Sequence, residues 1–244
     1  MIKNAVSRHR RRGYKFGIRV PTTVAEALEL DRLNGNDYWE EALKKEMNGV
    51  RVAFKIGKEN EKIPPGFKYV GTMMIFDIKL DFTRKARLVA RGDLTEAPIT
   101  LTYSSVVSRE SVRIAFLLAA LNEIDVSMFD IGNAYLTAPT TEKLYTYAGP
   151  EFGEDEGKLC IIVRALYGLK SSGAAYRNHF AETLLQLGFE SCYADADVWR
   201  RAALKKDDSK YYEYILTYVD DCLLISEDTL SIIDALKKNH STTH

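Results

Sequence analysis

The feature that most constrains this chain is a pair of apolar, strand-forming runs separated by adjacent aspartates. The runs Tyr212–Tyr218 and Cys222–Ile225 flank a short polar turn. This pattern predicts a β-hairpin with Asp220 and Asp221 at its tip. A tight hairpin loop normally has Gly or Asn where φ must be positive, and the segment from Val219 to Asp221 contains neither. A strained turn between good strands is more typical of a working site than of a simple connection.

The two neighbouring carboxylates allow two interpretations. They repel each other unless a cation lies nearby, so they form either an ordinary exposed turn or a divalent-metal site, because Mg²⁺ binds one or two carboxylates together with substrate phosphates. A third carboxylate supports the metal site. Asp130 follows the apolar residues Val126, Met128 and Phe129, where an acid is unfavourable in a strand and costly if it is buried without a partner. A bound metal would remove both objections.

Composition limits the possible classes of protein. The 244 residues are 46% hydrophobic and 28% charged, with 34 basic and 34 acidic side chains, which is typical of a globular chain with one large domain or two small ones. No apolar run approaches a membrane span or the core of a signal peptide. The three scattered cysteines fit a reducing compartment and no zinc pattern. We therefore expect an intracellular, cytoplasmic protein with no membrane partner.

The N-terminal region is strongly basic. It has no acid in its first 19 residues and contains Lys3, Arg8, Arg10, Arg11, Arg12, Lys15 and Arg19. These cations could contact phosphates, and a solvated tail is the simpler alternative.

Periodicity and capping patterns predict helices and strands in alternating groups. Helices are expected at 23–33, at 37–49 with Asp37 as the N-cap, at 111–122, at 171–187 and from 228 onward. Strands are expected at 52–56, 69–79, 85–91 and 159–166. The helix at 111–122 is apolar over most of its circumference, which predicts a buried helix.

Two segments carry cations in positions suited to anions. On the strand at 85–91, alternation places Lys85, Arg87 and Arg91 on one face, where they could bind a triphosphate or a nucleic-acid backbone. A solvated strand face is the alternative. The loop with Gly168 and Lys170 precedes a helix N-terminus, which favours an anion, and an exposed loop without a ligand is equally compatible.

Six motifs together resemble the reverse transcriptase of Ty1/copia-type retrotransposon polyproteins. They occur in the family's order and spacing between about Trp39 and Asp228, at Lys85–Gly92, Tyr103–Arg113, Phe129–Leu136, Ala165–Lys170, Leu187–Phe189 and Tyr218–Asp221. Each motif alone is weak, whereas six in register are specific.

The resemblance implies an α+β fold of the right-hand polymerase type. Its palm is an antiparallel sheet backed by helices, and its fingers are built largely from β-structure. By this comparison, residues 1–36 are a basic connector and residues 37–244 are the fingers and palm, truncated before the thumb.

The resemblance also implies a catalytic site. Asp130, Asp220 and Asp221 would be the catalytic carboxylates, and they would hold two Mg²⁺ ions together with the backbone carbonyl of Ile131. Mn²⁺ is an alternative ion. The implied reaction is two-metal nucleotidyl transfer from a dNTP to the primer 3′-hydroxyl, in which one ion lowers the pKa of the hydroxyl and the other neutralises the triphosphate. In this family pattern Asp221 is the less direct ligand.

Further residues are implied to bind the nucleotide. Lys85, Arg87 and Arg91 lie in the strand that contacts the triphosphate. Tyr135 matches the aromatic residue that excludes a ribose 2′-hydroxyl, with a core aromatic as the alternative. The template–nucleotide pocket would be lined by Tyr167, Gly168 and Lys170.

The implied partners are an RNA or DNA template with its primer, dNTPs, and the rest of the Pol polyprotein with its integrase and RNase H. The implied location is cytoplasmic, with virus-like particles as one site. Two departures concern the template contacts. Ser171–Gly173 replaces the family's usual Gln and Pro, and an acidic segment follows Gly92.

Two other functions fit parts of the pattern. A non-catalytic remnant that at most binds nucleic acid would explain the missing thumb. A palm-like nucleotidyl cyclase would share the paired carboxylates, but it would lack the blocks at Lys85–Gly92 and Tyr167–Lys170.

Overall fold

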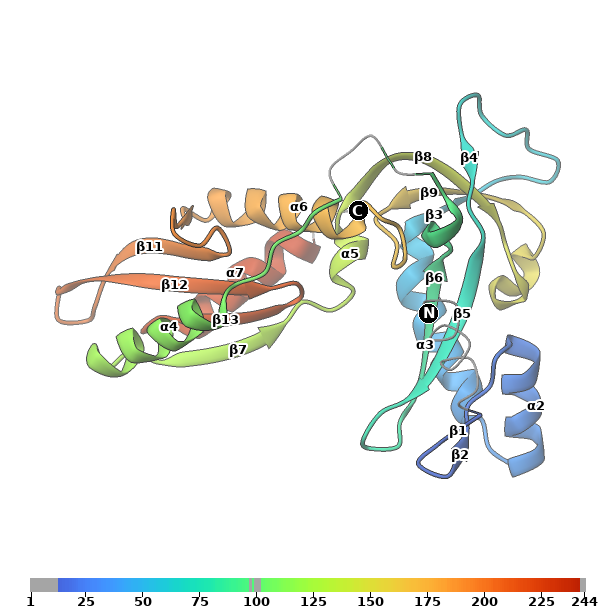
Figure 1. Cartoon of the computed structure of the whole chain (residues 1–244), viewed down its shortest axis with the longest axis horizontal. Helices are drawn as coiled ribbons and strands as arrows, with labels where there is room; N and C mark the ends of the chain where they lie inside the picture. Colours follow the sequence, from blue (N-terminus) through green and yellow to red (C-terminus); the bar gives the residue numbers. More distant parts are fainter. Residues whose placement is uncertain (1–12, 97, 99–101, 242–244) are drawn as a thin grey trace, which may run out of the picture. The chain divides into compact units, whose positions relative to one another are not determined.

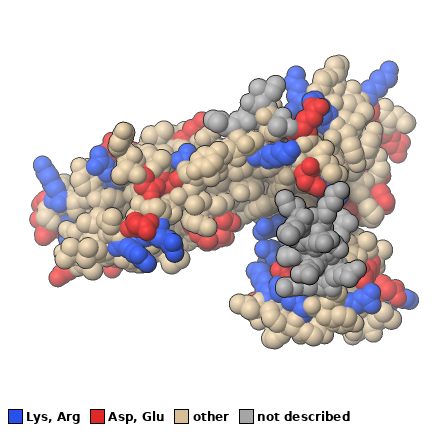
Figure 2. All heavy atoms as spheres, viewed as in Figure 1, with Lys and Arg blue, Asp and Glu red and all other residues tan. Residues whose placement is uncertain are grey.

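The computed structural model describes residues 13–96, 98 and 102–241, and the chain divides into two compact units (Figure 1). Unit 1 comprises Met1–Ala97 and Thr140–Lys170, and unit 2 comprises Pro98–Pro139 and Ser171–His244. The basic side chains predicted to contact phosphates at 3–12 lie outside the described residues. None of the described helices is long and apolar enough to cross a membrane. Basic and acidic side chains are intermixed on the visible surface (Figure 2).

The described residues of unit 1 include the helices α2 (Val24–Asn34) and α3 (Tyr38–Val50). Both were predicted. The side chain of Thr23 accepts the backbone N–H of Glu26, as the capping pattern indicates. The predicted cap of α3 is wrong, because Asp37 makes no side-chain capping bond. Instead the buried carboxylate of Asp31, on α2, accepts the N–H groups of Trp39 and Glu40 at 2.9 Å. The cap is tertiary, since it comes from the neighbouring helix.

The strands described in unit 1 form three small sheets. The hairpin β1–β2 is the first, β5–β6 is the second, and the third has the order β3-β9-β8-β4, in which β3 and β9 pair antiparallel and β4 and β8 pair in parallel. The described part of unit 1 also contains the short 3₁₀ helices η1, η2 and η3. The bounds are β1 Tyr14–Lys15, β2 Ile18–Arg19, η1 Arg51–Ala53, β3 Phe54–Ile56, β4 Lys68–Tyr69, β5 Thr72–Ile78, β6 Arg84–Ala90, η2 Gly92–Leu94, β8 Pro139–Tyr147, η3 Pro150–Asp155 and β9 Leu159–Arg164.

The β5–β6 hairpin packs against α3. Alternate residues of β6 are buried, namely Ala86, Leu88 and Ala90, and the half-buried Glu46 of α3 accepts the N–H of Leu88 at 2.8 Å. The predicted alternation of β6 is therefore confirmed. Its other face carries Lys85 and Arg87, whereas Arg91 follows the last residue of the strand.

Unit 2 is an antiparallel sheet with helices. The sheet has the order β10-β11-β12-β13-β7, so β7 lies at one edge. With unit 1, it confirms the α+β class. The bounds are α4 Arg109–Leu121, β7 Val126–Asp130, α5 Ala134–Thr137, α6 Ser172–Gln186, β10 Glu190–Ser191, β11 Val198–Leu204, β12 Lys210–Tyr218, β13 Asp221–Ile225 and α7 Thr229–Ser241.

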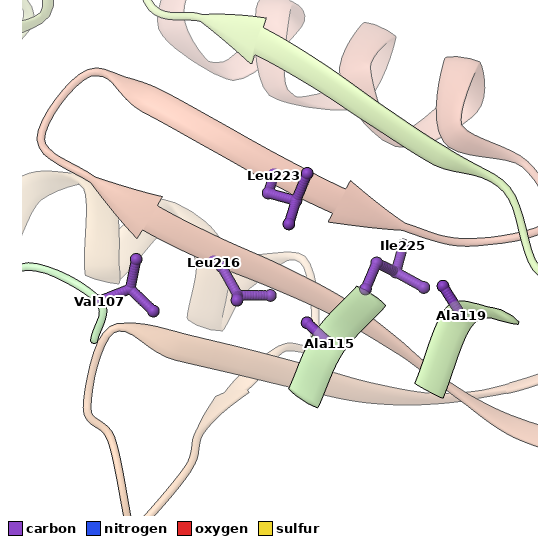
Figure 3. Packing of buried hydrophobic residues seen from close by; sticks show 6 residues of the cluster. All are labelled: Val107, Ala115, Ala119, Leu216, Leu223 and Ile225. Carbon is purple, nitrogen blue, oxygen red and sulfur yellow. The ribbon is translucent and has the colours of Figure 1, made fainter. Parts of the chain in front are cut away.

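Helix α4 lies on the sheet of unit 2 through its small residues. In Figure 3, Ala115 and Ala119 point toward Leu216, Leu223 and Ile225 of the hairpin strands. The prediction of a fully buried helix is wrong, because Leu117 and Leu121 are 58% and 72% exposed. A helix on one sheet face buries only one stripe of its surface, and apolar residues around the whole helix do not show how many sides are covered.

Candidate active site

The aspartate hairpin is formed as predicted, and its turn has an unusual backbone. Tyr218 pairs with Asp221, so Val219 and Asp220 form the loop. Val219 has a φ of 57°, whereas Asp220 is not among the residues with positive φ. Positive φ at the first loop position alone is the pattern of a type II′ turn, which prefers Gly there. A β-branched residue in this conformation is a true outlier.

Strand β7 brings the third carboxylate beside this turn. β13 pairs with β7 so that Asp221 lies directly opposite Asp130, and the Ile131 N–H donates to the carbonyl of Asp220 at 2.9 Å. Directly opposed residues share one face of a sheet, with Cα atoms about 4.5–5.5 Å apart. The fold therefore gathers all four residues of the predicted metal shell at one end of the sheet.

The exposure of these aspartates differs from the expectation. Asp130 and Asp221 are exposed, and Asp220 is half-buried. Asp130 is therefore not the buried carboxylate that its apolar neighbours had predicted, because β7 is an edge strand whose Met128, on the same face, is itself 76% exposed. Among the described residues, no group of three His, Cys, Asp or Glu side chains is placed to hold a metal ion. The strand register thus brings the backbones of Asp130 and Asp221 together, whereas the side-chain carboxylates do not point at one common position for a metal ion.

A buried thiol reports the combined charge of the three aspartates. Cys222 lies on β13 next to Asp221 and is buried. Its pKa is raised by burial first, and further by the negative charges of Asp221, Asp220 and Asp130. The direction of this shift agrees with the strand register, which places Asp130 opposite Asp221 at the turn that carries Asp220.

Tyr135 lies on the short helix α5, which follows Asn133 in the left-handed conformation. Its half-buried ring contacts that of Tyr176 on α6 at 5.8 Å between centroids. A Cβ at Gly173 would lie 3.8 Å from the Tyr135 hydroxyl. Gly173 is one of the predicted departures, and its lack of a side chain leaves this space open.

In unit 1 the predicted nucleotide-binding residues fall into two groups. Lys85, Arg87, Tyr167 and Gly168 line a pocket of about 390 Å³ together with Ile75, Asp77 and Val89. The Arg87 guanidinium lies 4.2 Å from the centre of the Tyr167 ring, a stacking distance. The pKa of Lys85 is lowered by burial, and further by the charges of Arg87 and Lys79.

The other two cations bond to neighbouring loop residues and are not among the residues that line this pocket. Arg91 pairs with Asp93 at 3.0 Å, and Lys170 donates to the carbonyl of Thr95 at 2.6 Å. Gly168 explains why this loop lies so close to β6. A Cβ there would lie 2.1 Å from the carbonyl oxygen of Ala90, and the N–H of Ala90 donates to the carbonyl of Tyr167 at 2.7 Å.

Residues 56–243 match the family model for reverse transcriptase (RNA-dependent DNA polymerase). The chain belongs to this family. It is 33% identical over 181 residues to the truncated transposon Ty1-A Gag-Pol polyprotein of Saccharomyces cerevisiae, an alignment of 72% of this chain and 14% of that protein. It is also 33% identical over 184 residues to the transposon Ty1-DR5 and Ty1-LR2 Gag-Pol polyproteins of the same yeast, covering 72% of this chain and 10% of each. The predicted resemblance to the Ty1/copia type is confirmed, and the chain spans a small part of these relatives.

In this member of the reverse transcriptase family, Asp195 and Asp197 also bond to other elements of unit 2, and the sequence did not indicate these contacts. Asp195 accepts bonds from the Ser108 N–H and the Ser111 hydroxyl at the start of α4. Asp197 is buried, pairs with Arg177 at 2.9 Å, and its carbonyl accepts the N–H of Thr217. The only signal in the sequence is an Asp-Ala-Asp stretch before a strand, which is too common to interpret.

Proposed function

We propose that this chain is the fingers and palm of an RNA-directed DNA polymerase. Unit 1 corresponds to the fingers and unit 2 to the palm, and the reaction is nucleotidyl transfer from a dNTP to the 3′-hydroxyl of a primer on an RNA or DNA template. The observation that supports it best is the pairing of Asp130 opposite Asp221, beside a strained turn that carries Asp220. The rest of a Gag-Pol polyprotein, including integrase and RNase H, would supply the partners.

The donor set of the aspartate cluster suits Mg²⁺, since it consists of hard oxygen atoms. Asp130, Asp220, Asp221 and the carbonyl of Ile131 would hold two ions, with Mn²⁺ as a substitute. When bound, the ions supply charge stabilisation of the triphosphate and activation of the primer hydroxyl. An aspartate side chain can rotate about two torsion angles, so its carboxylate can turn toward an ion once the backbone is in place. The pairing of Asp130 opposite Asp221 supports such a backbone placement.

The nucleotide-binding residues have separate tasks in this proposal. Lys85 and Arg87 bind the triphosphate, with Tyr167 holding the Arg87 guanidinium in place. Arg91, Gly168 and Lys170 position the adjoining loops through the contacts described above. Tyr135 contacts the deoxyribose and disfavours a 2′-hydroxyl. Positioning and electrostatics account for the chemistry, and no protein nucleophile is required.

One observation favours the alternative of a non-catalytic chain that only binds nucleic acid. In the described part of the chain, the carboxylates form no ready metal site. The same experiment separates the two functions.

The test is Mg²⁺-dependent dNTP incorporation on a primed RNA template. We expect Asp220→Asn and Asp130→Asn to lower incorporation at least about 100-fold, because the charge that holds the ions is reduced. Asp234→Asn is the matched control, since Asp234 is exposed on α7 in the same unit and should leave the rate unchanged. Full activity of Asp220→Asn would refute the site, and no incorporation by the unaltered chain would favour the non-catalytic alternative.

A further inference from the structure

Three tyrosines form a contiguous aromatic surface on the sheet of unit 1. Tyr69 of β4 pairs in register with Tyr145 of β8, and Tyr147 lies on the same face two residues further along β8. The ring centroids are 5.7 Å apart for Tyr69–Tyr145, 5.9 Å for Tyr145–Tyr147 and 6.4 Å for Tyr69–Tyr147. Tyr69 and Tyr147 are 57% and 48% exposed. Core packing therefore leaves much of both rings available to a ligand.

A hollow of about 290 Å³ adjoins this tyrosine surface. Tyr69 and Tyr147 form part of its wall, together with the threonines at positions 22, 23, 72 and 146. The volume lies just below the usual range for ligand pockets, roughly 300–1,000 Å³, so the hollow can take only a small group.

A carboxylate without a cationic partner lies at the edge of the hollow. Glu151 is half-buried, and a Cβ on Gly149 would lie 2.6 Å and 2.7 Å from its two carboxylate oxygens. The missing side chain of Gly149 therefore makes room for this carboxylate. Within the described residues, no Lys, Arg or His pairs with Glu151. The pKa of Glu151 is raised by burial, and further by Glu156 nearby. A ligand that donates hydrogen bonds would compensate for this lost solvation.

From these features we propose that the tyrosine surface binds single-stranded nucleic acid, and that the adjoining hollow takes one unstacked base whose amino group donates to Glu151. Aromatic side chains on a sheet stack bases of any sequence. A carboxylate accepts from an exocyclic amino group, as when Glu or Asp recognises cytosine N4. Cytosine is therefore favoured over thymine, which lacks an amino group.

The surroundings fit a polyanion better than a protein partner. Lys143 is exposed and lies two residues before Tyr145 on β8, on the face of the strand that carries the tyrosines. Lys68 is also exposed, and it precedes Tyr69 on β4, so strand alternation places it on the opposite face from the Tyr69 ring. The single bond from Lys68 to Glu96 joins two exposed side chains, so it is easily exchanged for a phosphate. Duplex nucleic acid is disfavoured because its bases are already stacked and cannot enter the hollow.

The experiment is fluorescence anisotropy of labelled oligo-dC and oligo-dT, about 12 nucleotides long, with the full chain in EDTA. We expect Tyr147→Ala to weaken binding of both oligonucleotides about tenfold, because a stacking surface is lost. Tyr147→Phe should bind like the unaltered chain. Tyr193→Ala is the matched control, since Tyr193 is fully exposed in unit 2. Equal affinities of Tyr147→Ala and Tyr193→Ala would overturn the site.

The base preference has its own test. Glu151→Ala should remove the preference for oligo-dC over oligo-dT, whereas Glu154→Ala, an exposed glutamate in the same 3₁₀ turn, should retain it. No preference in the unaltered chain would overturn the role of Glu151. Oligo-rC and oligo-rU, compared in the same assay, show whether RNA or DNA is the better ligand.

Failure of this proposal is distinguishable from failure of the polymerase proposal. Binding in EDTA requires no metal ion, so Asp220→Asn should bind oligo-dC as the unaltered chain does. A chain that binds but does not polymerise would support this site alone. If the unaltered chain polymerises and Tyr147→Ala binds oligonucleotides with unchanged affinity, the tyrosine site is refuted. The proposed role of the aspartates in polymerisation is then unaffected.

Discussion

Val219 holds a β-branched side chain at a φ of 57° beside the paired aspartates. Conformations of this kind cost about 1–3 kcal/mol and persist only where the surrounding structure enforces them. Here the enforcing contacts are the antiparallel pairs on both sides of β13. The strained backbone of Val219 is therefore stabilised by strand pairing on both sides of β13, with β12 and with β7.

Replacing this residue with glycine should stabilise the protein. Val219→Gly removes the strain at positive φ, and the gain exceeds the entropic penalty of a glycine, about 0.5–1 kcal/mol. We expect the free energy of unfolding to rise by about 1 kcal/mol in urea denaturation. Val126→Gly, on the edge strand β7 of the same unit, should lower it. A decrease for Val219→Gly would show that the turn is not strained.

At the scale of elements, one ion pair ties β11 to β12. Arg201 lies opposite Glu213, and its guanidinium contacts the buried carboxylate at 2.7 Å. Ser226, just after β13, donates to the same carboxylate at 2.7 Å. The Arg201 guanidinium also lies 4.5 Å from the centre of the Phe189 ring. This network fixes the far end of the strands that carry the aspartates.

Removing one partner of this pair should destabilise unit 2. Arg201→Met leaves the Glu213 charge buried and unpaired, so we expect a loss of about 3 kcal/mol in the free energy of unfolding. Arg200→Met is the matched control on the same strand. Arg200 pairs with Glu190 between exposed side chains, and its loss should cost less than about 1 kcal/mol. Equal losses in the two variants, measured by urea denaturation, would contradict this account.

At the scale of the whole molecule, the chain passes between its two units at 97–98, 139–140 and 170–171. Each unit is therefore assembled from segments that are distant in sequence. Each also contains one buried free thiol, Cys160 in unit 1 and Cys222 in unit 2. Burial raises the pKa of both, that of Cys160 from 9.0 to about 11.

These thiols predict a loss of stability at alkaline pH. The unfolded chain releases its thiol protons near pH 9, while the folded chain keeps them, so stability is complete below pH 9 and falls as the pH rises toward about 11. We expect Cys160→Ala to show a shallower decrease than the unaltered chain when unfolding is measured from pH 8 to pH 11. Cys192→Ala, at a partly exposed position, should change the slope less. An unchanged slope in Cys160→Ala would contradict the shift.

Local patterns predicted most elements correctly. The capping box at Thr23, the alternation of β6 and the aspartate hairpin depend on interactions within a few residues, which are readable from the chain. The errors concern long-range contacts. The cap of α3 comes from Asp31, the outer side of α4 is exposed at Leu117, and Asp130 lies at the exposed end of an edge strand.

The sequence by itself determined the family, the carboxylates of the candidate site and the two strands of their hairpin, because motif order and short-range periodicity carry that information. Only the tertiary structure decided that Asp130 pairs opposite Asp221, that Lys85 and Arg87 share a pocket with Tyr167, and that three tyrosines meet beside Glu151. These are pairings between segments far apart in the chain, set by strand register and packing. No local pattern encodes them.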